Sequence, residues 1–274
     1  MKKIIVIGKR SFIGSNLYFF LKKKKLKVKL FDLNKFLKLS IRSFKDVDYI
    51  INCSIHKNYL IKRYDEKKDF DFLVAKKISN LKIKQIFLSS RRVYKPQSNI
   101  FENSKLSSNC LYSKNKIITE KKLIKILQKK LLILRISNII GLNLHSNSRK
   151  IHQTFINIFI KNIKKNIVYD NKKIFKDFLS IDKFLQIFYL ILIKNFNGIY
   201  NVSIGKKVYL NDLISWLNHH NSNKVKIMSL PKRFNKDAFF LNNSKLKKKI
   251  GINIELKELE LYCKKLSKLI FKKV

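Results

Sequence analysis

Short apolar runs alternate with longer amphipathic or charged segments along most of the chain. Runs of this kind, bounded by turn residues, predict buried strands, and the segments between them predict helices. Strands that alternate with helices are typical of an α/β fold with a doubly wound parallel sheet. The predicted strands cover Lys3–Ile7, Lys27–Phe31, Asp48–Ser54, Ile86–Leu88 and Leu131–Ile136, with a very short one near Leu37–Ile41. The predicted helices end near Lys24, cover Glu66–Ser79, begin at Leu111, and include Leu210–Leu217.

The loop between the first predicted strand and the first helix has the sequence GKRSFIG. Glycines at both ends let the backbone approach a pyrophosphate that lies at the N-terminus of the helix. The middle position, which is glycine in a complete motif of this kind, is Ser11. The pattern predicts a dinucleotide-binding turn made of Gly8, Arg10, Ser11, Phe12, Ile13 and Gly14, with Ser54 near the cofactor.

Asp32 follows Gly14 by 18 residues (32 − 14), at the end of the second predicted strand. A carboxylate there suits the hydroxyls of an adenosine ribose. The alternative is a helix cap or a turn, which aspartate also favours. Arg10 favours a different cofactor, since a guanidinium in the loop suits a 2′-phosphate. The cofactor is therefore expected to be NAD or NADP.

Candidate chemistry follows the strand Ile86–Leu88, which ends in two hydroxyls, Ser89 and Ser90. Tyr112 and Lys116 stand four residues apart (116 − 112) and share one face of the helix that begins at Leu111. We expect Ser90, Tyr112 and Lys116 to be catalytic, with Ser89 as the alternative to Ser90. The Y-x-x-x-K spacing also occurs at Tyr18/Lys22, Tyr64/Lys68 and Tyr169/Lys173, but only Tyr112 lies just downstream of such a strand.

The order of GKRSFIG, SSRRVY, YSKNK and LRISNIIG resembles the extended short-chain dehydrogenase/reductases, the nucleotide-sugar epimerase/dehydratase family. Three later stretches resemble it too, so the resemblance covers nearly the whole chain. They are FKDFLSIDKF at 175–184, GIYNVSIG at 198–205 and LPKRFNKDAFFLNNSKLKKKIGI at 230–252.

The resemblance implies a Rossmann-like NAD(P)-binding domain at 1–143 plus 177–204. It implies a smaller C-terminal α/β substrate-binding domain at 144–176 plus 205–274. It also implies a cytoplasmic homodimeric oxidoreductase or epimerase that acts on a nucleotide sugar, in polysaccharide biosynthesis. Lys116 would hold the nicotinamide ribose and favour the phenolate of Tyr112, and the substrate would meet Arg92, Asn138 and Arg233.

Family dehydratases carry an Asp-Glu pair directly after the hydroxyl residue, where this chain has Arg91 and Arg92. Dehydration is therefore not expected. Two reactions remain, 4-ketoreduction and C4 epimerisation, with Tyr112 as the acid and base. Asp177 and Asp182 are expected to fix the return to the sheet and to cap the following helix.

Composition changes this picture little. The 274 residues include 62 Lys plus Arg against 17 Asp plus Glu, a net charge of +45, which would ordinarily indicate nucleic acid. However, only eight of the basic residues are Arg, and the lysines are spread evenly, which is typical of a coding bias. We expect no specific nucleic acid, although an inactive cofactor-binding sensor or a nucleic-acid-associated protein remains the alternative.

Three widely spaced cysteines indicate reduced thiols rather than a metal site or a disulfide framework. The most apolar later segment, Phe184–Ile193, is too short to span a membrane, and the first apolar run is too short for an export signal.

Overall fold

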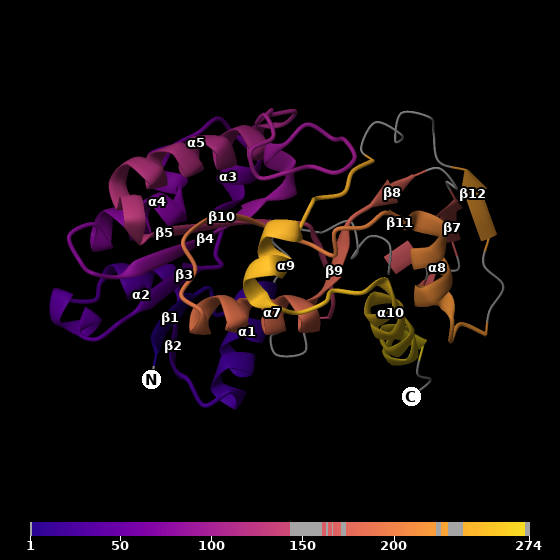
Figure 1. The fold of residues 1–274 in the computed structure, drawn as a ribbon, viewed down its shortest axis with the longest axis horizontal. Coiled ribbons are helices and arrows are strands. Elements are labelled where there is room, and N and C mark those ends of the chain that lie inside the picture. Colours follow the sequence, from indigo (N-terminus) through magenta and orange to yellow (C-terminus); the bar gives the residue numbers. More distant parts are fainter. Residues whose placement is uncertain are drawn as a thin grey trace.

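A six-stranded sheet forms the centre of the molecule (Figure 1). The computed structural model describes residues 2–142, 161–162, 164–165, 167–170, 174–222, 226–229 and 238–271. The strand order is β10-β5-β4-β3-β1-β2 and every pairing is parallel. The doubly wound α/β fold predicted from the sequence is therefore confirmed. The strands are β1 (Lys3–Ile7), β2 (Lys27–Phe31), β3 (Tyr49–Asn52), β4 (Lys84–Ser90), β5 (Leu131–Ile136) and β10 (Gly198–Val202).

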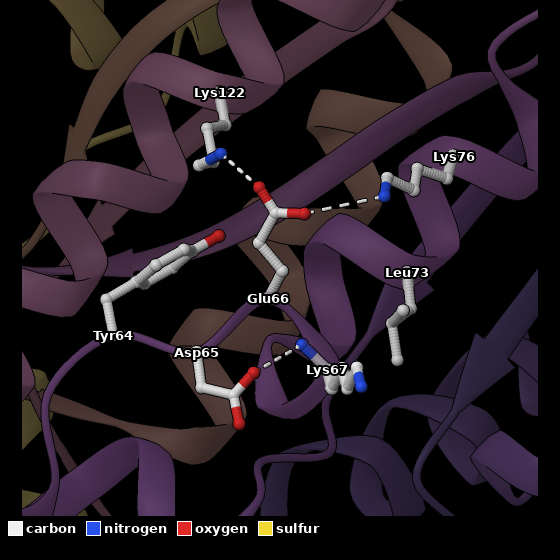
Figure 2. A pocket seen from close by; sticks show the side chains of 7 residues that line it. All are labelled: Tyr64, Asp65, Glu66, Lys67, Leu73, Lys76 and Lys122. Atoms are coloured by element: carbon white, nitrogen blue, oxygen red, sulfur yellow. Dashed lines mark hydrogen bonds and ion pairs between the residues drawn. The ribbon is translucent and has the colours of Figure 1, made fainter.

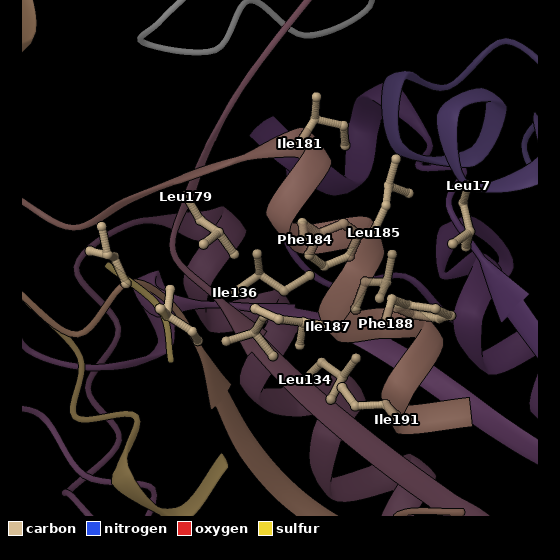
Figure 3. Packing of buried hydrophobic residues seen from close by; sticks show 14 of the residues in the cluster. Leu17, Leu134, Ile136, Leu179, Ile181, Phe184, Leu185, Ile187, Phe188 and Ile191 are labelled. Carbon is tan, nitrogen blue, oxygen red and sulfur yellow. The ribbon is translucent and has the colours of Figure 1, made fainter. Parts of the chain in front are cut away.

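Helices cover both faces of this sheet, because alternate strand residues point to opposite sides. In β1, Ile4 and Val6 belong to one buried cluster, and Ile5 and Ile7 to another. The first cluster includes α1 (Phe12–Lys23) and α7 (Ile181–Ile193), and the second includes α4 (Phe70–Ile78) and α5 (Leu111–Leu127). Figure 3 shows Phe184, Ile187 and Phe188 of α7 beside Leu134 and Ile136 of β5. Burial on both faces explains the continuous apolar runs of the strands.

One predicted element was wrong, and another begins later than expected. The expected short strand near Leu37–Ile41 is absent from the described structure, which has a helix, α2 (Leu33–Leu37), and a 3₁₀ turn at Ile41–Phe44. Leu33 and Phe36 are both buried, and their spacing of three residues suits a helix rather than a strand. The helix predicted at Glu66–Ser79 begins only at Phe70, because Asp69 caps it by accepting a hydrogen bond from the Phe72 N–H (3.1 Å).

Most of the remaining elements lie on the side of the molecule beyond the sheet, whereas α3 (Lys57–Ile61) packs against α5. In Figure 1 the pairs β8/β11 and β7/β12 lie on that side with α8 and α10, while α9 contacts β10 and α7. The two-domain division stays a prediction. The strands are β6 (Asn138–Ile140), β7 (Ile167–Asp170), β8 (Phe175–Lys176), β9 (Phe178–Ser180), β11 (Val208–Tyr209) and β12 (Lys226–Ser229). The helices are α3 (Lys57–Ile61), α8 (Leu210–Asn218), α9 (Ser244–Ile250) and α10 (Leu256–Phe271).

Asp177 joins segments that are distant in the sequence. Its fully buried carboxylate accepts hydrogen bonds from the N–H groups of Ile204 (3.0 Å), Gly205 (3.2 Å) and Leu241 (3.1 Å). Asp182, in contrast, is exposed in the first turn of α7, and the residue that caps this helix is Ser180. Asp177 thus fixes the return to the sheet, as expected, but the capping role expected of Asp182 belongs to Ser180.

Replacing Asp177 with Ala is expected to lower the free energy of unfolding by about 3 kcal/mol or more, because buried N–H groups lose their acceptor. Asp182→Ala, the matched control, should cost less than about 1 kcal/mol, since it removes only an exposed charge near a helix N-terminus. Urea denaturation followed by circular dichroism measures both values. Equal losses for the two variants would contradict this account of Asp177.

Candidate active site

The candidate residues gather at one edge of the sheet. Gly8, Asp32 and Ser54 lie just after β1, β2 and β3, and Ser90 is the last residue of β4. Because these strands are parallel neighbours, their carboxyl ends meet at the same edge. In open α/β sheets, ligands bind outside this edge.

The glycine loop is held tightly by its own backbone. Gly8 has a φ of +118°, which residues with a side chain rarely adopt, and its N–H donates to the Phe31 carbonyl oxygen (2.8 Å). A Cβ atom added to Gly14 would lie 2.5 Å from the Gly8 carbonyl oxygen. Both glycines are therefore required by the geometry.

Ser11 fits the middle of this loop without strain. Its φ of −83° and ψ of 143° are ordinary extended values, so this position does not need glycine. Its Oγ accepts a hydrogen bond from the Gly14 N–H (2.9 Å) and so caps α1. Phe12 and Ile13 follow in the first turn, where N–H groups have no acceptor within the helix. The loop therefore fits a dinucleotide pyrophosphate despite the serine.

Asp32 and Ser54 flank the loop. Asp32 is half-buried, and although it directly precedes α2, its side chain makes no capping hydrogen bond. The side chain therefore does not cap the helix through a hydrogen bond, and its role at a ribose stays a prediction. The Oγ of Ser54 lies 3.0 Å from where a Cβ on Gly8 would be, so this side chain lies against the loop. Arg10 is exposed in the same loop.

Lys116 is anchored beneath the end of β4. Only 6% of its surface is exposed, and its Nζ donates a hydrogen bond to the Leu88 carbonyl oxygen (3.0 Å). The ammonium also lies 4.3 Å from the centroid of the Phe87 ring. This contact holds α5 against β4, and the half-buried Tyr112 lies one helical turn before Lys116, towards the N-terminus of α5.

The two serines at the end of β4 have different surroundings. Ser89 is buried, and its Oγ donates to Glu120 Oε1 (2.5 Å), whose carboxylate is ion-paired with Arg135 (2.7 Å). Ser90 is half-buried, and its Oγ accepts from the Arg92 N–H (3.2 Å). Ser89 thus belongs to an internal polar network, whereas the hydroxyl of Ser90 accepts a backbone hydrogen bond at the end of β4.

Of the other Y-x-x-x-K pairs, the two whose lysine the structure describes lack a buried one. Lys22 is exposed and Lys68 is half-exposed, and Lys173 lies outside the described residues. Among the three lysines that the structure describes in this spacing, only Lys116 is buried. A buried ammonium is costly unless it is held by other groups, so its position separates the pair Tyr112/Lys116 from the others.

The residues predicted to contact the substrate differ in their surroundings. Arg92 is exposed, next to the end of β4. The side-chain amide of Asn138 donates to the Asp177 carbonyl oxygen (3.1 Å), which fixes the orientation of Asn138. Arg233 lies outside the described residues. Arg91 is buried instead, with its guanidinium 3.9 Å from the centroid of the Phe239 ring, so it packs against the C-terminal segment.

Two residues near the site had not been singled out from the sequence. Cys110 precedes α5, and although burial raises the pKa of its thiol, hydrogen bonds with Ser113 and the charge of Arg92 outweigh this effect and lower it. Asp71 on α4 is buried, and one of its carboxylate oxygens lies 3.7 Å from Lys116 Nζ. The only signal in the sequence was that acids are scarce in this chain.

A recess of about 530 Å³ lies apart from these residues, beside α4 and α5 (Figure 2). Glu66 in it is ion-paired with Lys76 (3.5 Å) and with Lys122, so its charges compensate one another. No candidate residue lines it; the lining residues are Tyr64, Asp65, Glu66, Lys67, Leu73, Lys76 and Lys122.

Over the described part of the chain, no cluster of three or more His, Cys, Asp and Glu side chains is arranged to hold a metal ion. Within the same residues, no helix combines the length and apolar character needed to cross a membrane.

Gly14→Ala is expected to weaken NADH binding at least about tenfold, because the new Cβ would displace the Gly8 carbonyl and open the loop. Ser11→Ala, the control in the same loop, should lose only the helix cap and keep most of the affinity. Fluorescence titration with NADH measures both. Wild-type affinity in the Gly14 variant would contradict this account of the loop.

Comparison with solved structures confirms the fold. UDP-glucuronic acid 4-epimerase from Bacillus cereus, solved with NAD, has a TM-score of 0.76 at 16% identity, over 98% of this chain and 100% of that one. UDP-N-acetylglucosamine 4-epimerase from Methanobrevibacter ruminantium M1, solved with UDP-N-acetylmuramic acid, has a TM-score of 0.75 at 20% identity, over 100% and 99%. dTDP-glucose 4,6-dehydratase from Bacillus anthracis, solved with NAD, has a TM-score of 0.74 at 16% identity, over 98% and 96%.

No curated protein sequence matches the chain. The model of the NAD dependent epimerase/dehydratase family matches residues 4–203, which include the glycine loop, all six strands of the central sheet, Ser90, Tyr112 and Lys116. The match confirms the family resemblance found in the sequence, and of the two expected cofactors, NAD and NADP, the family description names NAD. The chain belongs to the NAD-dependent epimerase/dehydratase family.

Proposed function

We propose that this protein transfers hydride to and from a carbon of a nucleotide-activated sugar, as a C4 epimerase or a 4-ketoreductase. The observation that carries the proposal is the buried Lys116, which is bonded to the Leu88 carbonyl and lies one turn from Tyr112, near the end of β4. The solved relatives supply the substrate class, since the three named above are enzymes of nucleotide sugars.

The roles of the residues follow from their chemistry. When bound, the nicotinamide supplies the hydride transfer. The ammonium of Lys116 would hold the ribose hydroxyls of a bound cofactor and would favour the phenolate of Tyr112, because opposite charges attract. Tyr112 then takes the proton from the sugar hydroxyl or returns it. The Ser90 hydroxyl donates a hydrogen bond to the same sugar oxygen.

The residues after Ser90 favour epimerisation or ketoreduction over water loss. Dehydration needs a further acid and base beside the sugar, and arginine supplies neither at neutral pH. Arg91 is moreover buried against Phe239. Arg92, Asn138 and Arg233 are proposed to contact the nucleotide sugar, Arg233 through its diphosphate.

The proposed cofactor is NAD, with NADP as the alternative that Arg10 leaves open. Asp32 supports NAD, because its carboxylate makes no capping bond and would repel a 2′-phosphate. The presence of Ser90, Tyr112 and Lys116 together favours the enzyme over an inactive sensor or nucleic-acid-associated protein, because a sensor needs no proton-transfer group.

We further propose a cytoplasmic location and a role in polysaccharide biosynthesis. The three cysteines are free thiols, as a reducing compartment favours, and nucleotide sugars are the activated precursors of polysaccharides.

Tyr112→Phe is expected to lower kcat at least about a hundredfold while NADH affinity stays within about twofold, because only the proton-transfer group is lost. Tyr18→Phe, in a pair whose lysine is exposed, should keep wild-type turnover. Chromatography of UDP-, dTDP- and GDP-hexose mixtures after incubation measures turnover. Unchanged turnover in the Tyr112 variant would refute the site.

A homodimer through α4 and α5 is proposed as the assembly. The outward side of these helices mixes the exposed Ile124 with Lys76, Lys121 and Lys125. Two such faces would repel each other at low ionic strength, and salt would screen the repulsion. Light scattering should therefore find a dimer fraction that rises with salt, and a monomer at every salt concentration would refute the assembly.

A further inference from the structure

Asp71 is a close neighbour of Lys116, the candidate catalytic lysine. It reaches Lys116 from α4, with Oδ2 3.7 Å from Nζ, and both side chains are about nine-tenths buried. The lysine is therefore held from two elements: the Leu88 carbonyl of β4 accepts its hydrogen bond, and Asp71 of α4 supplies an opposite charge.

A purely structural ion pair would satisfy both partners more completely. The distance of 3.7 Å is too long for a direct hydrogen bond. Asp71 Oδ1 is buried without a hydrogen-bond partner in the described structure. An unsatisfied buried carboxylate oxygen costs stability, so its presence here needs an explanation beyond packing.

We propose that Asp71 is a positioning residue for the reaction, which holds the Lys116 ammonium in place and moderates the electrostatic effect of that ammonium on Tyr112. The proposal rests on the proposed roles of Tyr112 and Lys116. A positive charge near a phenol favours the phenolate, and a negative charge beside that positive charge opposes this effect. When Asp71 is neutral, the charge of Lys116 thus acts on Tyr112 without opposition. When Asp71 is ionised, its negative charge reduces that effect.

Asp71 can change its charge in the neutral range. Burial raises the pKa of Asp71 to about 7, the nearby charge of Lys116 lowers it in part, and Asp69 raises it further. Tyr59 of α3 and Cys53 after β3 also face this carboxylate, and both groups are themselves neutral because burial raises their pKa. Lys116 is therefore the only cation among the groups named here. We expect its positive charge to act on both Asp71 and Tyr112.

The test replaces Asp71 with Asn, which keeps the shape and removes the charge. In protein labelled with ¹³C on the tyrosine rings, and without cofactor, the titration midpoint of Tyr112 should move to lower pH by about one unit. The Tyr112→Phe spectrum assigns the signal. In the active enzyme, the rising limb of kcat against pH should move in the same direction, with KM for the sugar nearly unchanged. Asp71→Glu, which restores the charge, should return both midpoints towards those of the wild type.

Asp69→Asn is the matched control, since Asp69 is also buried, directly before α4, but bonds Tyr64 and Thr119 rather than Lys116. It should move the Tyr112 midpoint much less. An equal midpoint in the Asp71→Asn variant and in the wild type would overturn the proposal. Should the variant fail to fold, ¹³C-carboxyl labelling of the unmodified protein decides: the Tyr112 ring signal should respond when Asp71 titrates near neutral pH, and no response would overturn it.

The two readouts separate this proposal from the proposed function. If Tyr112→Phe keeps its turnover but the ring titration still depends on Asp71, the proposed reaction fails and the coupling of Asp71 to Tyr112 stands. If Tyr112→Phe is inactive and the titration ignores Asp71, the reaction stands and the role of Asp71 fails.

Discussion

The hydrogen bond from Lys116 to the Leu88 carbonyl connects α5, which carries Tyr112 and Lys116, to β4, which ends in Ser90. It ties α5 to β4 at 3.0 Å, inside a site where the lysine is almost fully buried. An ammonium in such a place must be compensated, and the carbonyl, the Phe87 ring and Asp71 do this together. Since Tyr112 lies one turn away, the same contact sets where the phenol stands relative to the end of β4.

The parallel sheet does the rest of the positioning. Gly8, Asp32, Ser54 and Ser90 come from four different strand ends, and the sheet brings them to one edge. The glycine loop is closed by the bond from the Gly8 N–H to Phe31, which places the loop beside Asp32. In the proposed function, the binding of the cofactor and the transfer of the proton therefore fall to neighbouring parts of one edge of the sheet.

Much of this was predictable from the sequence, for physical reasons. Strands buried on both faces appear as apolar runs, so five of the six strands of the central sheet were predicted, and only β10 was not. Leu33 and Phe36 of the short α2 were missed because two buried residues do not define a period. The tolerance of Ser11 depends on its backbone angles, which the sequence does not reveal. Asp71 was missed because its partner is 45 residues away (116 − 71) on another helix.

The central claim is that Ser90, Tyr112 and Lys116 carry hydride and proton transfer on a nucleotide sugar. The most direct measurement follows the ultraviolet absorbance of the reduced nicotinamide while the protein, loaded with NAD, meets UDP-, dTDP- and GDP-hexoses in turn. The account predicts that one of these sugars reduces the bound cofactor. A protein that binds NAD tightly but whose cofactor none of these sugars reduces would contradict it.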